Sequence, residues 1–145
     1  MAKVKHATME DLDTILELLQ EFVNESDFTR NNSVGPEEIK SYAEFFIDSP
    51  EHLVLVWDGG VFCAGVVNGL FTRDSMVSEI VFYVKKEKRG RTPVVSILKT
   101  LEAWTSGRGI KKIVFHLIGS EPKGEFLEKR GYTLCESSFM KEVGD

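Results

Sequence analysis

The stretch KKEKRGRTPVVSILKTLEAW, residues 85–104, begins as a basic loop and continues as an amphipathic helix. Val94, Leu98 and Leu101 recur at helical spacing and predict a buried face. The preceding segment SEIVFYV, residues 78–84, is typical of a β-strand. A helix that starts directly after a strand exposes unpaired backbone N–H groups and partial positive charge, which suits a phosphate group. We therefore predict a strand, an anion-binding loop and a helix in that order.

The rest of the chain extends this pattern in both directions. Apolar periodicity and turn signals predict strands at residues 2–6, 52–57, 61–71, 111–118, 132–136 and 138–143, and helices at residues 8–25, 39–47 and 120–131. The resulting order, β-α-α-β-β-β-α-β-α-β-β, predicts an α/β fold: one mixed sheet with helices on both faces. No repeat or linker divides the sequence, so we expect a single domain over residues 1–145.

Composition limits the class of protein. The 145 residues are 42% hydrophobic and 28% charged, as in ordinary globular proteins. No apolar run reaches the roughly 18 residues that span a bilayer, and the N-terminus does not resemble a signal peptide. We therefore expect a cytoplasmic protein without membrane association. Cys63 and Cys135 lie in apolar, strand-like contexts and are expected to be buried, reduced thiols. No Cys or His spacing predicts a metal site.

Charge is distributed unevenly. Residues 85–91 hold five basic side chains and one acidic one, whereas the whole chain carries −5, so the rest of the chain carries −9. Such a local cluster is suited to one compact anion, or it is a solvated loop; charge alone leaves both open. A mostly acidic chain is not suited to binding nucleic acid over a broad face.

The run from Ser78 to Leu117, SEIVFYVKKEKRGRTPVVSILKTLEAWTSGRGIKKIVFHL, resembles the acyl-CoA-binding core of the GNAT superfamily of N-acyltransferases. The segment GEFLEKRGYTLCE, residues 124–136, is similar to the closing pattern of that family. The resemblance implies a GNAT-like fold over nearly the whole chain, acetyl-CoA as acyl donor and an amine as acceptor. Dimers are common in such families, so a homodimer is open.

The resemblance also implies which residues hold acetyl-CoA. The backbone around Tyr83 and Val84 would pair with the pantetheine arm. The family's pyrophosphate loop would correspond to Arg89, Gly90, Arg91, Thr92, Pro93, Val94 and Val95. Thr92 and Val94 replace two motif glycines, and Pro93 lacks an N–H group. Proline suits the first turn of a helix, so the helix start is reinforced while the loop is crowded. Weaker or altered acyl-CoA binding is expected.

Glu79 is the candidate general base, since several family members place a catalytic glutamate in a similar context. An apolar strand is expected to raise the pKa of its carboxyl group, which suits a base. The alternative is a solvated glutamate at a strand end. Tyr83 is expected on the same strand face, roughly 13 Å away, where both would line one cleft.

Other family positions differ. Leu127 stands where the family commonly has a tyrosine acid, and Ser120 where it often has asparagine. Tyr132 is expected to be a core residue. Phe28 and Arg30, in a polar loop between the first two helices, are candidates for contact with the acceptor.

Three functions remain open. The first is an N-acetyltransferase with Glu79 as base. The second is a catalytically inactive protein of this fold that binds CoA or a protein partner, which the missing glycines and the missing tyrosine favour. Nucleic-acid binding through residues 85–91 is the weakest. The identity of the acceptor amine does not follow from the sequence.

Overall fold

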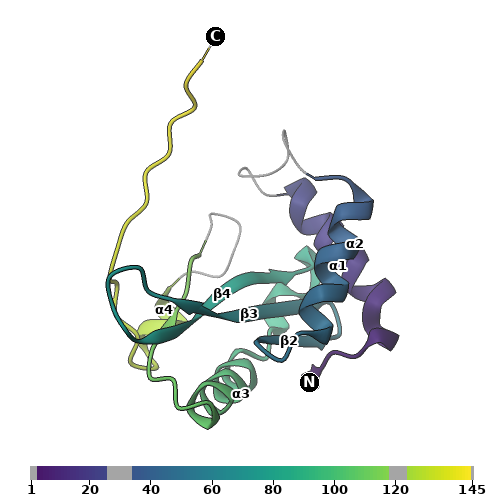
Figure 1. Cartoon of the computed structure of the whole chain (residues 1–145). Coiled ribbons are helices and arrows are strands. Elements are labelled where there is room, and N and C mark those ends of the chain that lie inside the picture. The colour runs from purple at the N-terminus through teal and green to yellow at the C-terminus, as the bar shows by residue number, and fades with distance from the viewer. Residues whose placement is uncertain (1–2, 26–33, 118–123, 145) are drawn as a thin grey trace.

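The computed structural model describes residues 3–25, 34–117 and 124–144. Its centre is one mixed sheet with the strand order β1-β2-β3-β4-β5 (Figure 1). The first four strands are antiparallel neighbours, and β5 runs parallel to β4. The strands are β1 (Lys5–His6), β2 (His52–Trp57), β3 (Gly60–Asn68), β4 (Ser75–Val84) and β5 (Ile113–Val114). The predicted mixed α/β architecture is confirmed.

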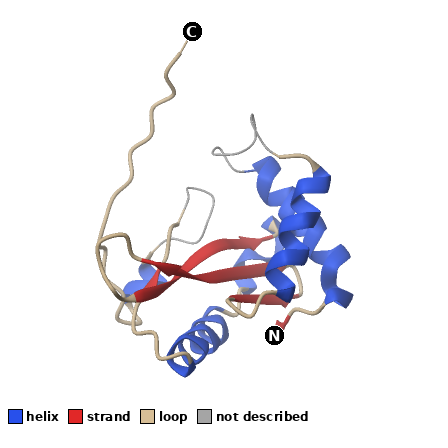
Figure 2. Ribbon diagram, in the orientation of Figure 1, coloured by secondary structure: helices blue, strands red, loops and turns tan. Residues whose placement is uncertain are grey.

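Helices cover both faces of this sheet (Figure 2). The elements are η1 (Met9–Asp11), α1 (Leu12–Glu25), α2 (Pro36–Asp48), η2 (Lys86–Arg91), α3 (Val94–Gly107) and α4 (Glu125–Glu128). Ile15 and Leu18 of α1 and Ala43 of α2 pack against one face. Ile97 and Leu101 of α3 pack against the other. The apolar periodicity of each helix thus selects the side that it buries.

The long β2–β3–β4 meander follows local turn chemistry. Gly59 has φ +86°, the left-handed conformation that the Asp58-Gly59-Gly60 turn requires. Gly60 lies directly against the Trp57 indole, so a Cβ atom at this position would overlap the ring. Both glycines are therefore needed, one for its backbone angle and one for a close approach.

The end of the sheet is shorter than predicted. The strand predicted at residues 111–118 pairs with β4 only through Ile113 and Val114. The strands predicted at 132–136 and 138–143 do not form: residues 133–144 run as an extended segment away from the sheet (Figure 1). A segment with β-propensity forms a strand only when a neighbouring strand is available to pair with it. Because β5 has only two residues, its free edge is too short to pair with a further strand.

The two cysteines have different environments. Cys63 is buried in β3, as predicted, and burial together with the nearby charge of Glu79 raises the pKa of its thiol to about 12. Cys135 is exposed in the extended C-terminal segment, so its expected burial is wrong for the same reason as the missing strand. In the described part of the chain, no helix has both the length and the apolar character that a membrane span requires.

Candidate functional site

Glu79 is the buried carboxylate of the molecule's central sheet. It lies in the middle of β4, and the residue is only 4% exposed. Its Oε1 accepts a hydrogen bond of 3.1 Å from the backbone N–H of His116. Its Oε2 is buried without a hydrogen-bond partner among the described residues. Burial raises the pKa of Glu79 to about 7, although the hydrogen bond from His116 opposes the shift. A solvated glutamate at a strand end is therefore excluded.

A β-bulge in β4 sets the direction of this side chain. Cys63 of β3 pairs with Val81 and Ala64 pairs with Glu79, so Ile80 is an extra residue between them. An extra residue reverses the alternation of side chains beyond it. Ala64, opposite Glu79, belongs to the core cluster on the α3 side, whereas Tyr83 belongs to the cluster on the α1 side. The expectation that Glu79 and Tyr83 share one face is wrong, because the bulge at Ile80 interrupts the alternation of side chains between the two faces of β4.

The edge of β4 is open next to Glu79. On its β5 side, β4 pairs only through Val77 and Ser78 in the described residues. From Glu79 to Val84, no strand of the described residues pairs with β4 on this side. An open strand edge offers N–H and C=O groups to an extended, amide-bearing ligand. The Val84 carbonyl is already an acceptor for Arg89 Nε at 2.9 Å.

The start of α3 lies just beyond this edge. Val94 N–H donates to the Thr92 carbonyl and Ile97 N–H to the Pro93 carbonyl. Val95 and Ser96, the exposed residues between them, have no backbone acceptor among the described residues. A Cβ atom at Gly90 would meet nothing within 4 Å, so the space beside the loop is open. The first turn of a 14-residue helix thus presents two free amides to an anion.

Most of the cationic side chains of residues 85–91 form ion pairs within the chain. Lys85 pairs with Glu17 at 2.9 Å and with Glu21 at 3.5 Å. Arg89 makes a 2.8 Å ion pair with Glu25 and lies 5.8 Å from the centre of the Tyr83 ring. Lys88 pairs with Asp58 at 3.1 Å, and the Thr92 hydroxyl donates to the Arg89 carbonyl. Of the five cations of this loop, only Lys86 and Arg91 have no ion-pair or hydrogen-bond partner in the described parts of the chain.

Three of these acidic partners form one stripe on α1. Glu17, Glu21 and Glu25 are spaced four residues apart and therefore lie on one helix face. Burial raises the pKa of Glu25, but hydrogen bonds from Arg89 and Tyr83 outweigh it, so the pKa lies below its ordinary value. The stripe neutralises much of the charge on residues 85–91, and no local sequence signal links the two segments.

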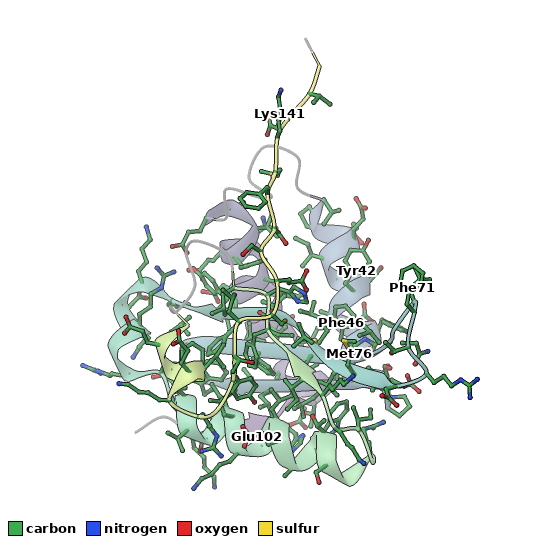
Figure 3. All side chains as sticks on the ribbon, turned by 90° about the vertical axis from the view of Figure 1, so that its left-hand side faces the viewer. Tyr42, Phe46, Phe71, Met76, Glu102 and Lys141 are labelled. Carbon is green, nitrogen blue, oxygen red and sulfur yellow. The ribbon has the colours of Figure 1, made fainter. Side chains whose placement is uncertain are left out.

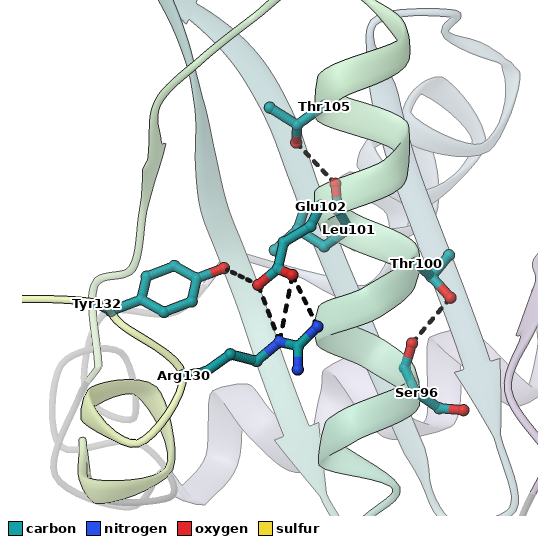
Figure 4. Close-up of polar contacts among 7 residues, drawn as sticks. All are labelled: Ser96, Thr100, Leu101, Glu102, Thr105, Arg130 and Tyr132. Carbon is teal, nitrogen blue, oxygen red and sulfur yellow. Dashed lines mark hydrogen bonds and ion pairs between the residues drawn. The ribbon is translucent and has the colours of Figure 1, made fainter.

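A polar clamp holds the C-terminal elements against α3 (Figure 4). Arg130 donates to both carboxylate oxygens of Glu102, with an ion pair of 2.9 Å, and the Tyr132 hydroxyl donates to the same carboxylate at 3.0 Å. The Tyr132 ring also packs edge-on against Phe115 at 5.7 Å. Tyr132 is thus half-buried and structural. Its hydroxyl is engaged with Glu102 of α3.

The remaining predicted positions divide into two groups. Leu127 is buried in α4 and has no proton to donate. Phe28, Arg30 and Ser120 lie outside the described residues.

Comparison with solved structures agrees with the architecture. The fold is similar to a putative acetyltransferase from Pyrococcus furiosus (TM-score 0.71, 21% identity, covering 99% of this chain and 100% of that one). It is also similar to a predicted acetyltransferase from Clostridium acetobutylicum, solved with acetyl-CoA (TM-score 0.75, 14% identity, covering 98% of this chain and 96% of that one). A transcriptional regulator from Bacillus halodurans C-125 has a similar structure as well (TM-score 0.76, 12% identity, covering 99% of this chain and 100% of that one).

Sequence comparisons find less. No family model and no curated protein matches the chain. At the identities above, structural likeness establishes the fold and leaves the activity to be argued from the site. The chain has the fold of the GNAT acetyltransferases.

Proposed function

We propose that this chain is an acyl-CoA-dependent N-acetyltransferase that transfers an acetyl group from acetyl-CoA to a primary amine. The observation that carries the proposal is Glu79, a buried carboxylate with a free Oε2 beside an open strand edge. A general base is useful here, since an amine with a lysine-like pKa of about 10.4 is almost fully protonated at neutral pH. A base with a pKa near 7 is matched to that pH.

The roles of the residues follow from their positions. Glu79 Oε2 takes the proton of the amine, directly or through a water molecule, while the amine nitrogen forms a bond to the thioester carbonyl carbon. The C–S bond then breaks and the CoA thiolate leaves. A free thiol has a pKa of about 8.5, so this leaving group accepts a proton from solvent without a protein acid. Leu127 is therefore compatible with turnover.

The open edge of β4 is the proposed contact for the pantetheine arm, through the backbone near Tyr83 and Val84. The pyrophosphate would lie at the first turn of α3, against the amides of Val95 and Ser96, with Arg91 adding charge. Glycines that would let more backbone approach are absent, and Arg89 is engaged with Glu25. The proposed site therefore depends on the helix terminus more than on the loop.

Acetyl-CoA is expected to raise the thermal stability of the protein. Ligand at about 100 times Kd adds about 2.7 kcal/mol to the free energy of unfolding. For a domain of this size, the midpoint of thermal unfolding should rise on the order of 5–10 °C. Differential scanning fluorimetry with acetyl-CoA and free CoA measures this shift. No shift at millimolar concentrations of either ligand would contradict binding.

A charge change at Val95 separates ligand binding from helix stability. Val95 is 56% exposed in the first turn of α3. Val95→Asp should stabilise the helix by about 0.3–1 kcal/mol, since a negative charge favours a helix N-terminus. The same charge should weaken acetyl-CoA binding roughly tenfold or more by repelling the pyrophosphate. The changes in unfolding temperature and Kd, measured by calorimetry, are thus expected to oppose each other.

Val95→Asn is the matched control for that variant. It introduces a polar side chain of similar size without charge, so Kd should stay near the wild-type value. Equal Kd values for Val95→Asp and the wild type would place the pyrophosphate away from α3.

The ion pairs of residues 85–91 help to judge two other candidate functions, nucleic-acid binding and an inactive protein that binds acyl-CoA or a protein partner. Three of the five cations of this segment are paired within the chain, which reduces the charge available to nucleic-acid phosphates. The same pairing, together with Leu127, favours the inactive acyl-CoA- or partner-binding protein as second candidate. That candidate predicts no turnover on any amine, with a thermal shift on addition of acetyl-CoA if it binds acyl-CoA and no shift if it binds a protein partner instead.

A further inference from the structure

A second feature of the molecule is an apolar cavity on the α1 and α2 side of the sheet. Its volume is about 280 Å³, and α1, α2, β2, β3 and β4 all contribute to its walls. Among the residues that the structure describes, the lining side chains are apolar except for the phenol of Tyr42 and the thiol of Cys63. Protein interiors hold few voids larger than a water molecule. An apolar cavity of about 150 Å³ suffices for benzene, so this one has room for a phenyl or short alkyl group.

The cavity opens between large, partly exposed side chains. Tyr42 on α2 is 51% exposed, Ile80 on β4 39% and Val34 37%. Tyr42 and Phe46 follow one another along α2, with ring centres 6.5 Å apart (Figure 3). Phe46 in turn packs against His52 of β2 at 4.8 Å. The described residues at the mouth are therefore mostly hydrophobic, like those of the interior.

The bulge in β4 connects this cavity to Glu79. Ile80 and Val81 both line the cavity and directly follow Glu79 in the chain. Because Ile80 is the extra residue of the bulge, Glu79 faces α3 while its two successors face α1 and α2. Beyond Ser78 the edge of β4 has no strand neighbour on the β5 side within the described residues. A molecule bound at this edge would therefore have Glu79 on one face of β4 and the cavity residue Ile80 next to it on the other.

We propose that this cavity holds a hydrocarbon group of the substrate, carried by the acceptor amine or by the acyl chain. The inference rests on the proposed acyl transfer. The described part of the walls holds no charged or amide side chain that would compensate for the loss of hydration of a polar substituent. Each methylene that enters is expected to raise kcat/KM about fourfold, which corresponds to about 0.8 kcal/mol. Highly polar amines, such as amino sugars, should be poor acceptors.

Two substrate series identify which partner carries the group. In the first, acetyl-CoA is fixed and straight-chain primary amines from ethylamine to octylamine are compared. In the second, ethylamine is fixed and acyl-CoAs from acetyl to octanoyl are compared. One series should show the rise per methylene and then a plateau when the cavity is full. Flat dependence in both series would overturn the proposal.

Binding of benzene tests the cavity without any activity. Benzene should shift the methyl NMR signals of Val61 and Ile80, which line the cavity, and leave those of the exposed Leu134 unchanged. No shift at saturating benzene would overturn the proposal. Benzene binding without turnover on any amine would instead show a real cavity and contradict the proposed acyltransferase function, so the two failures differ.

Ala43→Leu fills the cavity from α2, since Ala43 lines it and is 2% exposed. This variant should lose both the benzene shifts and the chain-length dependence. Ala103→Leu is the matched control, because Ala103 is exposed on α3 and distant from the cavity walls. Retention of chain-length dependence in a folded Ala43→Leu protein would contradict the proposal. If that variant does not fold, the two substrate series on the wild type still decide, because flat dependence in both overturns the proposal.

Discussion

Replacing Glu79 with glutamine is expected to lower kcat by about 10²–10⁴-fold, with little change in the affinity for acetyl-CoA. Glutamine keeps the shape of the side chain and an oxygen that can accept the hydrogen bond from His116 N–H. It removes the group that accepts the amine proton. The effect should therefore fall on turnover, because the proposed acetyl-CoA contacts are the strand edge and α3.

The pH dependence of the same enzyme provides a second readout. The pKa of Glu79 is raised to about 7, so the wild-type rate should rise as pH increases through that value and the carboxylate form accumulates. Glu79→Gln should lack this rise. Glu128→Gln is the control, since Glu128 is an exposed carboxylate on α4. Steady-state kinetics from pH 5.5 to 9 on any amine that is turned over would measure both. Unchanged kcat in Glu79→Gln would remove Glu79 from the mechanism.

The stability of the protein should fall as pH rises through the same range. The pKa of Glu79 is raised from 4.5 to about 7 by burial, so the folded state binds a proton that the unfolded state releases. The free energy of unfolding then decreases with increasing pH between these values. Stabilisation by this group is complete below about pH 4.5 and lost above about pH 7. The loss is about 3 kcal/mol, a large part of the stability of a typical domain.

Comparison with Glu79→Gln isolates this contribution. Other groups also have shifted pKa values: burial lowers the pKa of His52, and hydrogen bonds from Lys5 and Thr8 lower the pKa of Asp11. Because both proteins share them, their effects cancel in the difference. Urea denaturation without ligand should show Glu79→Gln gaining about 3 kcal/mol over the wild type between pH 4.5 and 8. A constant difference over that range would show that Glu79 is not held in a protonated, buried form.

These two predictions describe one trade between function and stability. A buried carboxylate with an unpartnered oxygen destabilises the fold at neutral pH, and the same property makes it a competent base. The glutamine variant is expected to be the more stable protein and the poorer catalyst. That combination is difficult to obtain from a residue with a purely structural role.

Much of the architecture was predictable because local signals agreed with one another. The strand at His52–Trp57 matches its prediction residue for residue, since its apolar run is bounded by turn residues on both sides. The helices that end at Glu25 and begin at Val94 were likewise marked by apolar periodicity and by adjacent polar or proline residues. The order of elements then restricted the fold to a mixed sheet.

The site was predicted less completely. Glu79 was identified as a candidate because of its residue type in an apolar strand, and its burial and raised pKa agree with that expectation. The bulge at Ile80 was not predicted. A bulge is defined by the register of two paired strands, and the sequence of one strand does not specify that register. The predicted position of Tyr83 on the same face as Glu79 was therefore wrong.

The sequence by itself determined features that depend on a few neighbouring residues. These are the helix faces, the Asp58-Gly59 turn, the strand SEIVFYV and the helix start after Pro93. What only the tertiary structure decided are relations between distant segments. The stripe on α1 that neutralises residues 85–91, the open edge of β4 and the cavity behind Ile80 are of this kind. Hydrophobic periodicity specifies which side of an element is buried, whereas ion pairs, strand register and cavities depend on which elements meet.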